Sequence, residues 1–453
     1  MPVFLQKKDR ETYVVTFMLN KRFVRSAYLL GNFNAFQKSV ELEYCSKGSI
    51  CTTIVLPPGR YSYYYEIDGE KYTESGKDFD SLYLKGDLVP KFPFKAVERR
   101  FSSIYQIFVD RFLCVRKEGD RLGGNLYEIS EKLRYIRSLG FDAVYLTPIF
   151  RSDTYHRYDV KDYFNVDDDL GGNVAFKHFL KVAHELGLKV ILDIPLHHTS
   201  DKFWAFGDKM FSNWYYIKGG DYDKFDNVKS MPKINYRYAL EYFKRVLLFW
   251  QNFGIDGFRI DVASGINPMY LWEMKKLLNI PMIGEVWGMP YLWRDSVDGV
   301  MNYEVYEELV KFLKGEESNL CQVLRSQLAL YTFDFLWNSW LFLGTHDTAR
   351  IFTLLNDLEK VKAGLVFIYT WAGTPMVYYG DEIAMEGGND PDNRRCMEWS
   401  KSSELQEFIR RLRGIGQISF LKCGKNTISY GNEGIKVEIS NKPVFDGKYY
   451  RLV

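Results

Sequence analysis

From about Ser103 onwards, short apolar runs alternate with amphipathic segments that have helical spacing. Alternation of this kind is typical of parallel strands joined by crossover helices. About eight repeats over roughly 300 residues favour a closed (β/α)8 barrel over an open sheet. No Gly-x-Gly-x-x-Gly follows a strand-like run, which also disfavours a dinucleotide-binding fold. The strand-like runs lie at 104–109, 143–146, 190–194, 257–260, 281–284, 341–343 and 375–379.

The barrel pattern occupies only the middle of the 453 residues. Residues 1–95 contain short β-type runs broken by Gly, Pro and Asp-Gly turns, which predicts an N-terminal β-sandwich. We expect the α/β barrel domain at 96–400, followed by a last helix and a short C-terminal β-unit at 401–453. The connection at 199–236 is long, aromatic and polar. Since long connections inside compact domains are usually functional, it is expected to form a loop subdomain over the catalytic face.

Charge and apolar content exclude several classes of protein. The 60 basic and 58 acidic residues leave a net charge of +2, so the chain lacks the large positive excess that is typical of proteins that bind nucleic acid or an anionic membrane. No apolar stretch reaches the roughly 20 residues that span a bilayer, and the first residues do not resemble a secretory signal. A cytoplasmic protein follows. Its six cysteines are expected to be reduced thiols, although Cys45 and Cys51 are close enough to pair. No metal-site spacing occurs.

Polar residues follow four of the strand-like runs. Asp193 follows one run, Asp261 ends the next, Glu285 comes after a third, and His346 and Asp347 follow a fourth. Because barrel enzymes carry their catalytic groups at the carboxyl ends of the strands, these side chains are expected to meet on one face. A single acid there could simply cap a strand, but four such positions make coincidence improbable.

Two carboxyl groups are the minimum for cleaving a glycosidic bond, one ionised and one protonated. Arg259 and Asp261 lie two positions apart on one strand, so their side chains share a face, and the cation favours ionised Asp261. Glu285 has apolar neighbours in sequence, which favour a protonated carboxyl. The purely structural interpretation is a buried Arg–Asp pair and a helix-capping glutamate.

The motifs in these segments resemble those of the α-amylase family of glycoside hydrolases, and the resemblance extends over nearly the whole chain. Within the family the chain is most similar to the cyclomaltodextrinase, neopullulanase and maltogenic amylase group. The N-terminal segments AYLLGNFNAF and LPPGRYSYYYEIDG resemble a starch-binding-type β-sandwich. The motifs are DIPLHH (193–198), GFRIDVA (257–263), EVW (285–287), GTHDTAR (344–350), YQIFVDRF (105–112), MPKIN (231–235) and GTPMVYYGDEIAMEGGNDPDNRRCMEW (373–399).

The resemblance implies a catalytic role for three acids. Asp261 would form a covalent glycosyl-enzyme and Glu285 would act as general acid and then base. Asp347 would accept hydrogen bonds from ring hydroxyls and help to distort the sugar, and Arg259 would orient Asp261. Tyr158 would stack beneath the sugar on the non-reducing side of the scissile bond, and Trp287 would stack on the leaving side. The substrate-binding residues that the resemblance implies are Arg259, His198, His346, Tyr158, Asp159, Trp287, Asp392 and Arg395.

The chain also departs from the family pattern. His197 stands where relatives often carry an Asn that binds calcium, so we expect no required cofactor and no metal ligand. Ser264 and Gly265 replace the usual Asn-Glu, which leaves the acceptor preference open. The expected activity is retaining hydrolysis of α-1,4 bonds in maltooligosaccharides, cyclodextrins or pullulan. A 4-α-glucanotransferase is the alternative, and a non-catalytic carbohydrate-binding protein is a third. The N-terminal domain is expected either to bind glucan or to cover a partner's cleft in a homodimer.

Overall fold

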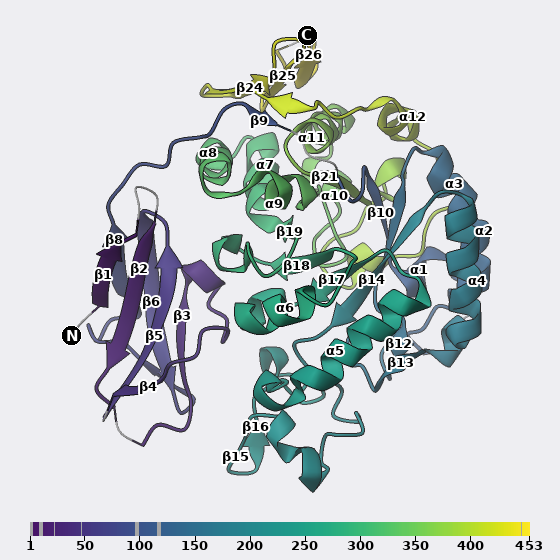
Figure 1. The fold of residues 1–453 in the computed structure, drawn as a ribbon. Helices are drawn as coiled ribbons and strands as arrows, with labels where there is room; N and C mark the ends of the chain where they lie inside the picture. The colour runs from purple at the N-terminus through teal and green to yellow at the C-terminus, as the bar shows by residue number, and fades with distance from the viewer. Residues whose placement is uncertain are drawn as a thin grey trace.

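The computed structural model describes residues 3–8, 12–21, 23–46, 48–95, 99–115, 119–444 and 446–453 (Figure 1). Residues 96–98, where the barrel domain was expected to begin, lie outside the described residues. Strands at the N-terminal end form a layered unit beside the barrel, and a small sheet at the C-terminal end lies near α11 and α12.

Eight parallel strands close into a barrel, as the alternating pattern predicted. Neighbours pair in chain order, and β21 returns to pair with β10. The strand at 299–302 is absent from the predicted runs, because its four residues Gly-Val-Met-Asn are too few and too mixed to stand out. The barrel strands are β10 (Ile104–Ile107), β11 (Ala143–Leu146), β14 (Lys189–Pro195), β17 (Gly257–Asp261), β18 (Met282–Val286), β19 (Gly299–Asn302), β20 (Trp340–Leu341) and β21 (Thr374–Tyr378).

Helices surround this barrel and supply the outer wall of its core. Helix α5 begins after Asn235, whose side chain accepts from the Arg237 amide, and ends at Gly254 with φ 110°. The expected helix over 127–139 is divided at Lys132 into α2 and α3. The helices are α1 (Val109–Phe112), α2 (Leu126–Glu131), α3 (Leu133–Ser138), α4 (Gly172–Glu185), α5 (Tyr236–Phe253), α6 (Pro268–Lys275), α7 (Tyr303–Lys314), α8 (Leu320–Leu330), α9 (Phe333–Asn338), α10 (Ile351–Leu355), α11 (Leu358–Thr370) and α12 (Glu404–Arg411).

The N-terminal unit has two antiparallel sheets around a core of its own. Asp68 and Gly69 have φ values of 54° and 86° and make the predicted tight turn between β6 and β7. Tyr63 and Tyr65 are buried in the core, and Tyr64 points to the other side of β6. The strands are β1 (Val3–Lys7), β2 (Tyr13–Leu19), β5 (Ser49–Leu56) and β4 (Glu43–Ser46) in one sheet, and β3 (Ala27–Gly31), β6 (Gly59–Ile67), β7 (Glu70–Tyr72) and β8 (Asp80–Leu84) in the other.

The C-terminal residues form a short antiparallel sheet, in line with the small β-unit expected there. A separate two-residue strand, β22 (Gln417–Ile418), pairs with β9 (Phe94–Lys95) from the segment that joins the N-terminal unit to the barrel. The sheet is made of β23 (Phe420–Cys423), β24 (Thr427–Gly431), β25 (Lys436–Ser440) and β26 (Tyr450–Leu452).

Two short strand pairs and several turns complete the connections above the barrel. The loop subdomain at 199–236 contains η3 (Lys209–Trp214), β15 (Ile217–Lys218), β16 (Asp221–Tyr222) and η4 (Phe225–Asn227). It projects from the barrel near α5 (Figure 1). Another pair, β12 (Phe150–Arg151) with β13 (Asp162–Val166), follows β11.

The expectation of reduced thiols is wrong for this structure, because all six cysteines are joined in disulfides. Sequence distance hides two of the three pairs: 282 residues separate Cys114 from Cys396, and 102 separate Cys321 from Cys423. The third pair is Cys45 with Cys51. Within the described ranges, no helix is both long enough and apolar enough to cross a membrane.

Candidate active site

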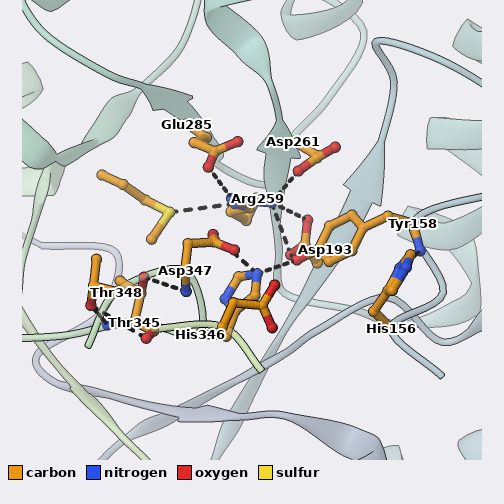
Figure 2. Close-up of polar contacts among 12 residues, drawn as sticks. His156, Tyr158, Asp193, Arg259, Asp261, Glu285, Thr345, His346, Asp347 and Thr348 are labelled. Carbon is orange, nitrogen blue, oxygen red and sulfur yellow. Dashed lines mark hydrogen bonds and ion pairs between the residues drawn. The ribbon is translucent and has the colours of Figure 1, made fainter. Parts of the chain in front are cut away.

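One buried arginine organises the carboxyl end of the barrel (Figure 2). Arg259 on β17 is fully buried, and its Nη1 donates to Asp261 at 2.8 Å and to both oxygens of Asp193 at 2.9 and 3.0 Å. Its Nη2 forms an ion pair with Glu285 at 2.8 Å. Three carboxyl groups from three neighbouring strands therefore share one guanidinium, whose fixed planar fork sets their relative positions.

Asp193 is the carboxyl group at the centre of this network. Tyr145 and Tyr158 donate their hydroxyl groups to it at 2.6 and 2.8 Å, in addition to the bonds from Arg259. Burial raises the pKa of Asp193 to about 6, although Arg259 and the two hydroxyl groups act in the opposite direction. It is not exposed to solvent, so its role is to hold Arg259 and Tyr158 in place.

Asp261 lies under opposing influences on its charge. Burial raises its pKa well above the ordinary value, and the nearby Glu285, Asp193 and Asp347 carboxyls act in the same direction. Arg259 opposes this effect, as predicted, but it is the smaller influence. One cation serves three carboxyl groups here, and its ion pair with Asp261 is the contact that favours the ionised form on which a nucleophilic role depends.

Glu285 is buried but has more polar partners than its sequence neighbours suggested. One oxygen accepts from the Val262 amide at 2.7 Å. The other accepts from the indole N–H of Trp287 at 3.2 Å and pairs with Arg259. Its side chain is 7% exposed, and that remaining surface faces a cavity. Glu285 is thus held at a fixed orientation beside Asp261.

His346 links the network to Asp347. Gln106 donates its amide to His346 Nδ1 at 2.7 Å, which leaves the proton of the neutral ring on Nε2. That nitrogen lies 2.6 Å from the Tyr158 hydroxyl and 3.2 Å from Asp347. Burial lowers the pKa of His346 well below its ordinary value, so the ring is neutral. Tyr158 and His346 are parallel, with ring centroids 5.7 Å apart.

A cavity of about 830 Å³ opens over these groups. Six of the residues predicted from the sequence line it: Asp261, Glu285, Asp347, His198, Tyr158 and Trp287. Arg259 and His346 lie beneath that surface and contact the lining residues. Asp347 has the most exposed carboxyl of the three acids, at 27%, and it pairs with Arg394 at 3.1 Å. The structure therefore brings together most of the predicted site.

Three predicted residues lie outside the cavity lining. Asp159 is buried, and its carboxylate accepts from the hydroxyl groups of Ser152 and Thr154 within its own loop. Asp392 and Arg395 are half-exposed and pair with each other. They lie only one or two positions from Asp390 and Arg394, which do line the cavity, and their binding role stays a prediction.

Sequence reasoning missed Asp390 and Arg394, which line the cavity in place of Asp392 and Arg395. Arg394 is 8% exposed and binds Asp347, Asp390 and the His346 carbonyl oxygen. Both residues occur in the motif at 373–399, but nothing in the pattern of charges distinguishes one arginine from the next. Burial decides which one points inward.

His197 and His198 occupy the position considered for calcium. Both are buried, and their Nδ1 atoms lie 3.3 Å apart. Burial lowers the pKa of His198 to about 4, and it stacks on Phe225 at 5.1 Å. Two neutral imidazoles do not suit a cation that prefers oxygen ligands. In the described part of the chain no three His, Cys, Asp or Glu residues group as metal ligands, so these residues do not fit a calcium ion.

The N-terminal unit forms one wall of the same cavity. Phe36, Lys38, Tyr64 and Glu66 are among the lining residues, and Phe36 stacks on Tyr64 with centroids 6.0 Å apart. Contacts with the barrel's loop subdomain hold this wall in place. Lys233 donates to the Lys38 carbonyl oxygen at 2.7 Å, Tyr216 donates to Glu41 at 2.9 Å, and Arg237 donates to Glu43 at 2.9 Å. No sequence pattern could have located these contacts, because they join segments nearly 200 residues apart.

Comparisons with known proteins agree with this geometry. A family model described as the alpha amylase catalytic domain matches residues 106–221 and 205–410. A cyclomaltodextrinase from Geobacillus thermopakistaniensis (strain MAS1) is 31% identical, over 85% of this chain and 79% of the relative. Neopullulanase 2 of Thermoactinomyces vulgaris is 30% identical, over 84% of this chain and 73% of its own. The ligand-free cyclic α-maltosyl-(1→6)-maltose hydrolase from Arthrobacter globiformis superposes with a TM-score of 0.70 at 26% identity, covering 78% of this chain and 97% of that one.

Proposed function

The chain belongs to the α-amylase family of glycoside hydrolases, and from that premise we propose that it hydrolyses α-1,4-glucosidic bonds of short or cyclic maltooligosaccharides with retention of configuration. The observation that carries this proposal is the pairing of Asp261 and Glu285 with two nitrogens of the same guanidinium, while both also line one cavity. Two carboxyl groups that contact the same guanidinium and line the same cavity can act on one anomeric centre, as a double displacement requires.

In the first step, Asp261 attacks the anomeric carbon and forms a glycosyl ester, while Glu285 transfers its proton to the departing oxygen. Arg259 stabilises the negative charge that both groups carry in turn, so it must contact the two carboxyls throughout the cycle. In the second step, Glu285 takes a proton from water, the resulting hydroxyl attacks the same carbon, and Asp261 leaves. Two inversions give net retention.

Three further groups position the sugar on the non-reducing side. Asp347 presents a partly exposed carboxylate that can accept from two ring hydroxyls, and Arg394 and His346 hold it from behind. The unpaired, buried Nε2 of His198 faces the same region and supplies another polar contact. Tyr158 offers a flat ring to the apolar face of the sugar.

The wall that the N-terminal unit builds supports the preference for short or cyclic substrates. A long helical glucan would have to pass Phe36 and Tyr64, which close one side of the cleft. The surface assigned from the sequence to a partner's cleft contacts this chain's own cleft. We therefore propose that one chain holds a complete site and that a homodimer through this surface is not required.

A product profile tests the proposal. Incubation with β-cyclodextrin, maltotriose, pullulan and soluble starch should release glucose and maltose, with the cyclic and short substrates consumed fastest. Proton NMR of the first product should show the α-anomer before mutarotation. Initial β-anomer would contradict the double displacement, and unreacted β-cyclodextrin and maltotriose would contradict the substrate class. Accumulation of chains longer than maltotriose would instead indicate a 4-α-glucanotransferase.

A cytoplasmic location stays a prediction. The three disulfides favour an oxidising compartment instead, since glutathione keeps most cytosolic thiols reduced. Alkylation of thiols before lysis, followed by mass spectrometry of the six cysteine peptides, decides between the two.

A further inference from the structure

A second cavity, of about 560 Å³, lies at the opposite end of the barrel from the carboxyl cluster. Several of its lining residues precede or begin barrel strands, whereas Asp261 and Glu285 lie at the carboxyl ends of theirs. Arg99 and Arg100 come before β10, Lys189 begins β14, and Asp298 comes directly before β19. Five cations line this cavity: Arg99, Arg100, Lys189, Lys275 and Arg294. The two carboxylates that line it are Asp298 and Asp334.

Two of the five cations are paired. Lys275 lies 3.3 Å from Asp298, and Arg294 lies 3.4 Å from Asp295. The other three form no ion pair within the part of the chain that the structure describes, although the Asp142 carboxylate acts on Arg99 from a greater distance. Arg99 lies over the ring of Trp337 at 4.4 Å, and the Lys189 ammonium donates to the Arg100 carbonyl oxygen at 2.6 Å. These contacts orient the side chains without neutralising them.

Collecting these charges has a physical cost. Burial lowers the pKa of Arg99 to about 10, which means that its charged form is poorly solvated where it lies. The chain as a whole has a net charge of only +2, so the excess here is local. A concave surface lined with one sign of charge concentrates the field and attracts counter-ions of the opposite sign. An anion in the cavity would relieve the repulsion among the cations.

We propose that this basic cavity binds a small molecule that carries phosphate groups, at a site separate from the catalytic one. Guanidinium groups hold phosphate oxygens with paired N–H donors, and Arg99 and Arg100 supply two such groups from adjacent positions. Lys189 and Lys275 add point charges from other elements. The volume accommodates a sugar phosphate or a diphosphate, and it is too small for a macromolecule.

Isothermal titration of the whole protein with inorganic pyrophosphate tests the site, with NaCl adjusted to keep ionic strength constant. We expect saturable binding of one pyrophosphate per chain, which weakens as salt increases. Glucose 1-phosphate and inorganic phosphate form two further arms. Tighter binding of glucose 1-phosphate than of inorganic phosphate would identify a sugar phosphate, and the reverse order would identify free phosphate or diphosphate. The absence of saturable binding in all three arms overturns the proposal.

Variants locate the binding. Arg100→Gln changes an exposed side chain that forms no ion pair with the described residues, so it should fold normally and weaken pyrophosphate binding about tenfold or more. Arg99→Gln should do the same, and Arg99→Lys should restore part of the affinity. Lys181→Gln on the exposed face of α4 is the control, with unchanged binding. Equal affinity of Arg100→Gln, Arg99→Gln and the wild-type protein overturns the proposal. Because binding is the readout, this result is independent of hydrolytic activity.

Discussion

The two ends of the barrel carry opposite excesses of charge. At the carboxyl end, one cation, Arg259, is shared by Asp193, Asp261 and Glu285. At the amino end, five cations surround a cavity with two carboxylates. The same parallel strands connect the two ends, so the difference comes from the residues placed immediately before and after each strand.

The contrast distinguishes two uses of incomplete charge pairing. The carboxyl end keeps its surplus acids buried and fixed by hydrogen bonds, which suits groups that exchange protons and bonds with a substrate. The amino end keeps its surplus cations on an open cavity held by few contacts, which suits reversible capture of an anion. Four predictions test or refine this contrast.

Asp261→Asn should lower kcat on maltotriose by about 10⁴-fold or more, because no nucleophile then remains at the anomeric carbon. Asp298→Asn, at the opposite end, is the matched control and should leave kcat within about twofold of the wild-type value. Initial-rate assays on both purified variants give the comparison. Similar losses in the two variants would mean that the ends do not differ in function.

The adjacent arginines Arg394 and Arg395 allow a comparison of two variants that differ by one position in the chain. Arg394→Gln should lower kcat/KM by about 10²-fold, because Asp347 loses a buried charged partner worth about 2–4 kcal/mol. Arg395→Gln removes only an exposed pair with Asp392 and should change kcat/KM less than about twofold. Steady-state kinetics on maltotriose measure both. A larger effect at Arg395 would support the substrate-binding role that the sequence analysis assigned to Arg395.

Phe36→Ala tests the wall supplied by the N-terminal unit. Loss of one stacking surface should raise KM for β-cyclodextrin by about five- to tenfold with little change in kcat, because aromatic contacts contribute about 1 kcal/mol. Phe4→Ala, an exposed phenylalanine on β1, is the control. An unchanged KM in Phe36→Ala would confine substrate recognition to the barrel.

The last expected effect concerns stability against pH and not activity. The folded-state pKa of Asp193 is about 6 and the unfolded value is about 3.9, so the folded chain binds the extra proton between these values. Its contribution to the free energy of unfolding is therefore largest below pH 4 and falls as pH rises to 6, by at most about 2 kcal/mol. Asp193→Asn should remove this slope in urea titrations at pH 4.5, 5.5 and 7. Parallel profiles of variant and wild type would contradict the raised pKa.

Strand periodicity and the polar residues at strand ends were sufficient to predict the barrel and the meeting of Asp261, Glu285 and Asp347 at one cavity. Asp261 and Glu285 follow apolar runs that only a buried strand explains, so their location is a local property of the sequence. The position of β19 was not predictable in this way, because Gly-Val-Met-Asn has too little pattern of its own.

Other features of the site depend on tertiary contacts, which cannot be predicted from the spacing of residues in the sequence. Whether Arg394 or Arg395 faces the cavity is decided by burial against Asp347. The raised pKa of Asp261 follows first from burial and then from the neighbouring carboxyls of Glu285, Asp193 and Asp347, which no single motif contains. Phe36 becomes part of the cleft only because the N-terminal unit packs on the loop subdomain.

The pairing of β9 with β22 affects the order in which the molecule can be completed during synthesis. Residues 94–95 leave the ribosome more than 300 residues before Gln417 and Ile418, their only strand partner in the described chain. The N-terminal unit therefore gains this strand pairing only after the barrel has been made. Removing the final forty residues would abolish the β9–β22 pairing, while the contacts of Lys233, Tyr216 and Arg237 with the N-terminal unit would remain.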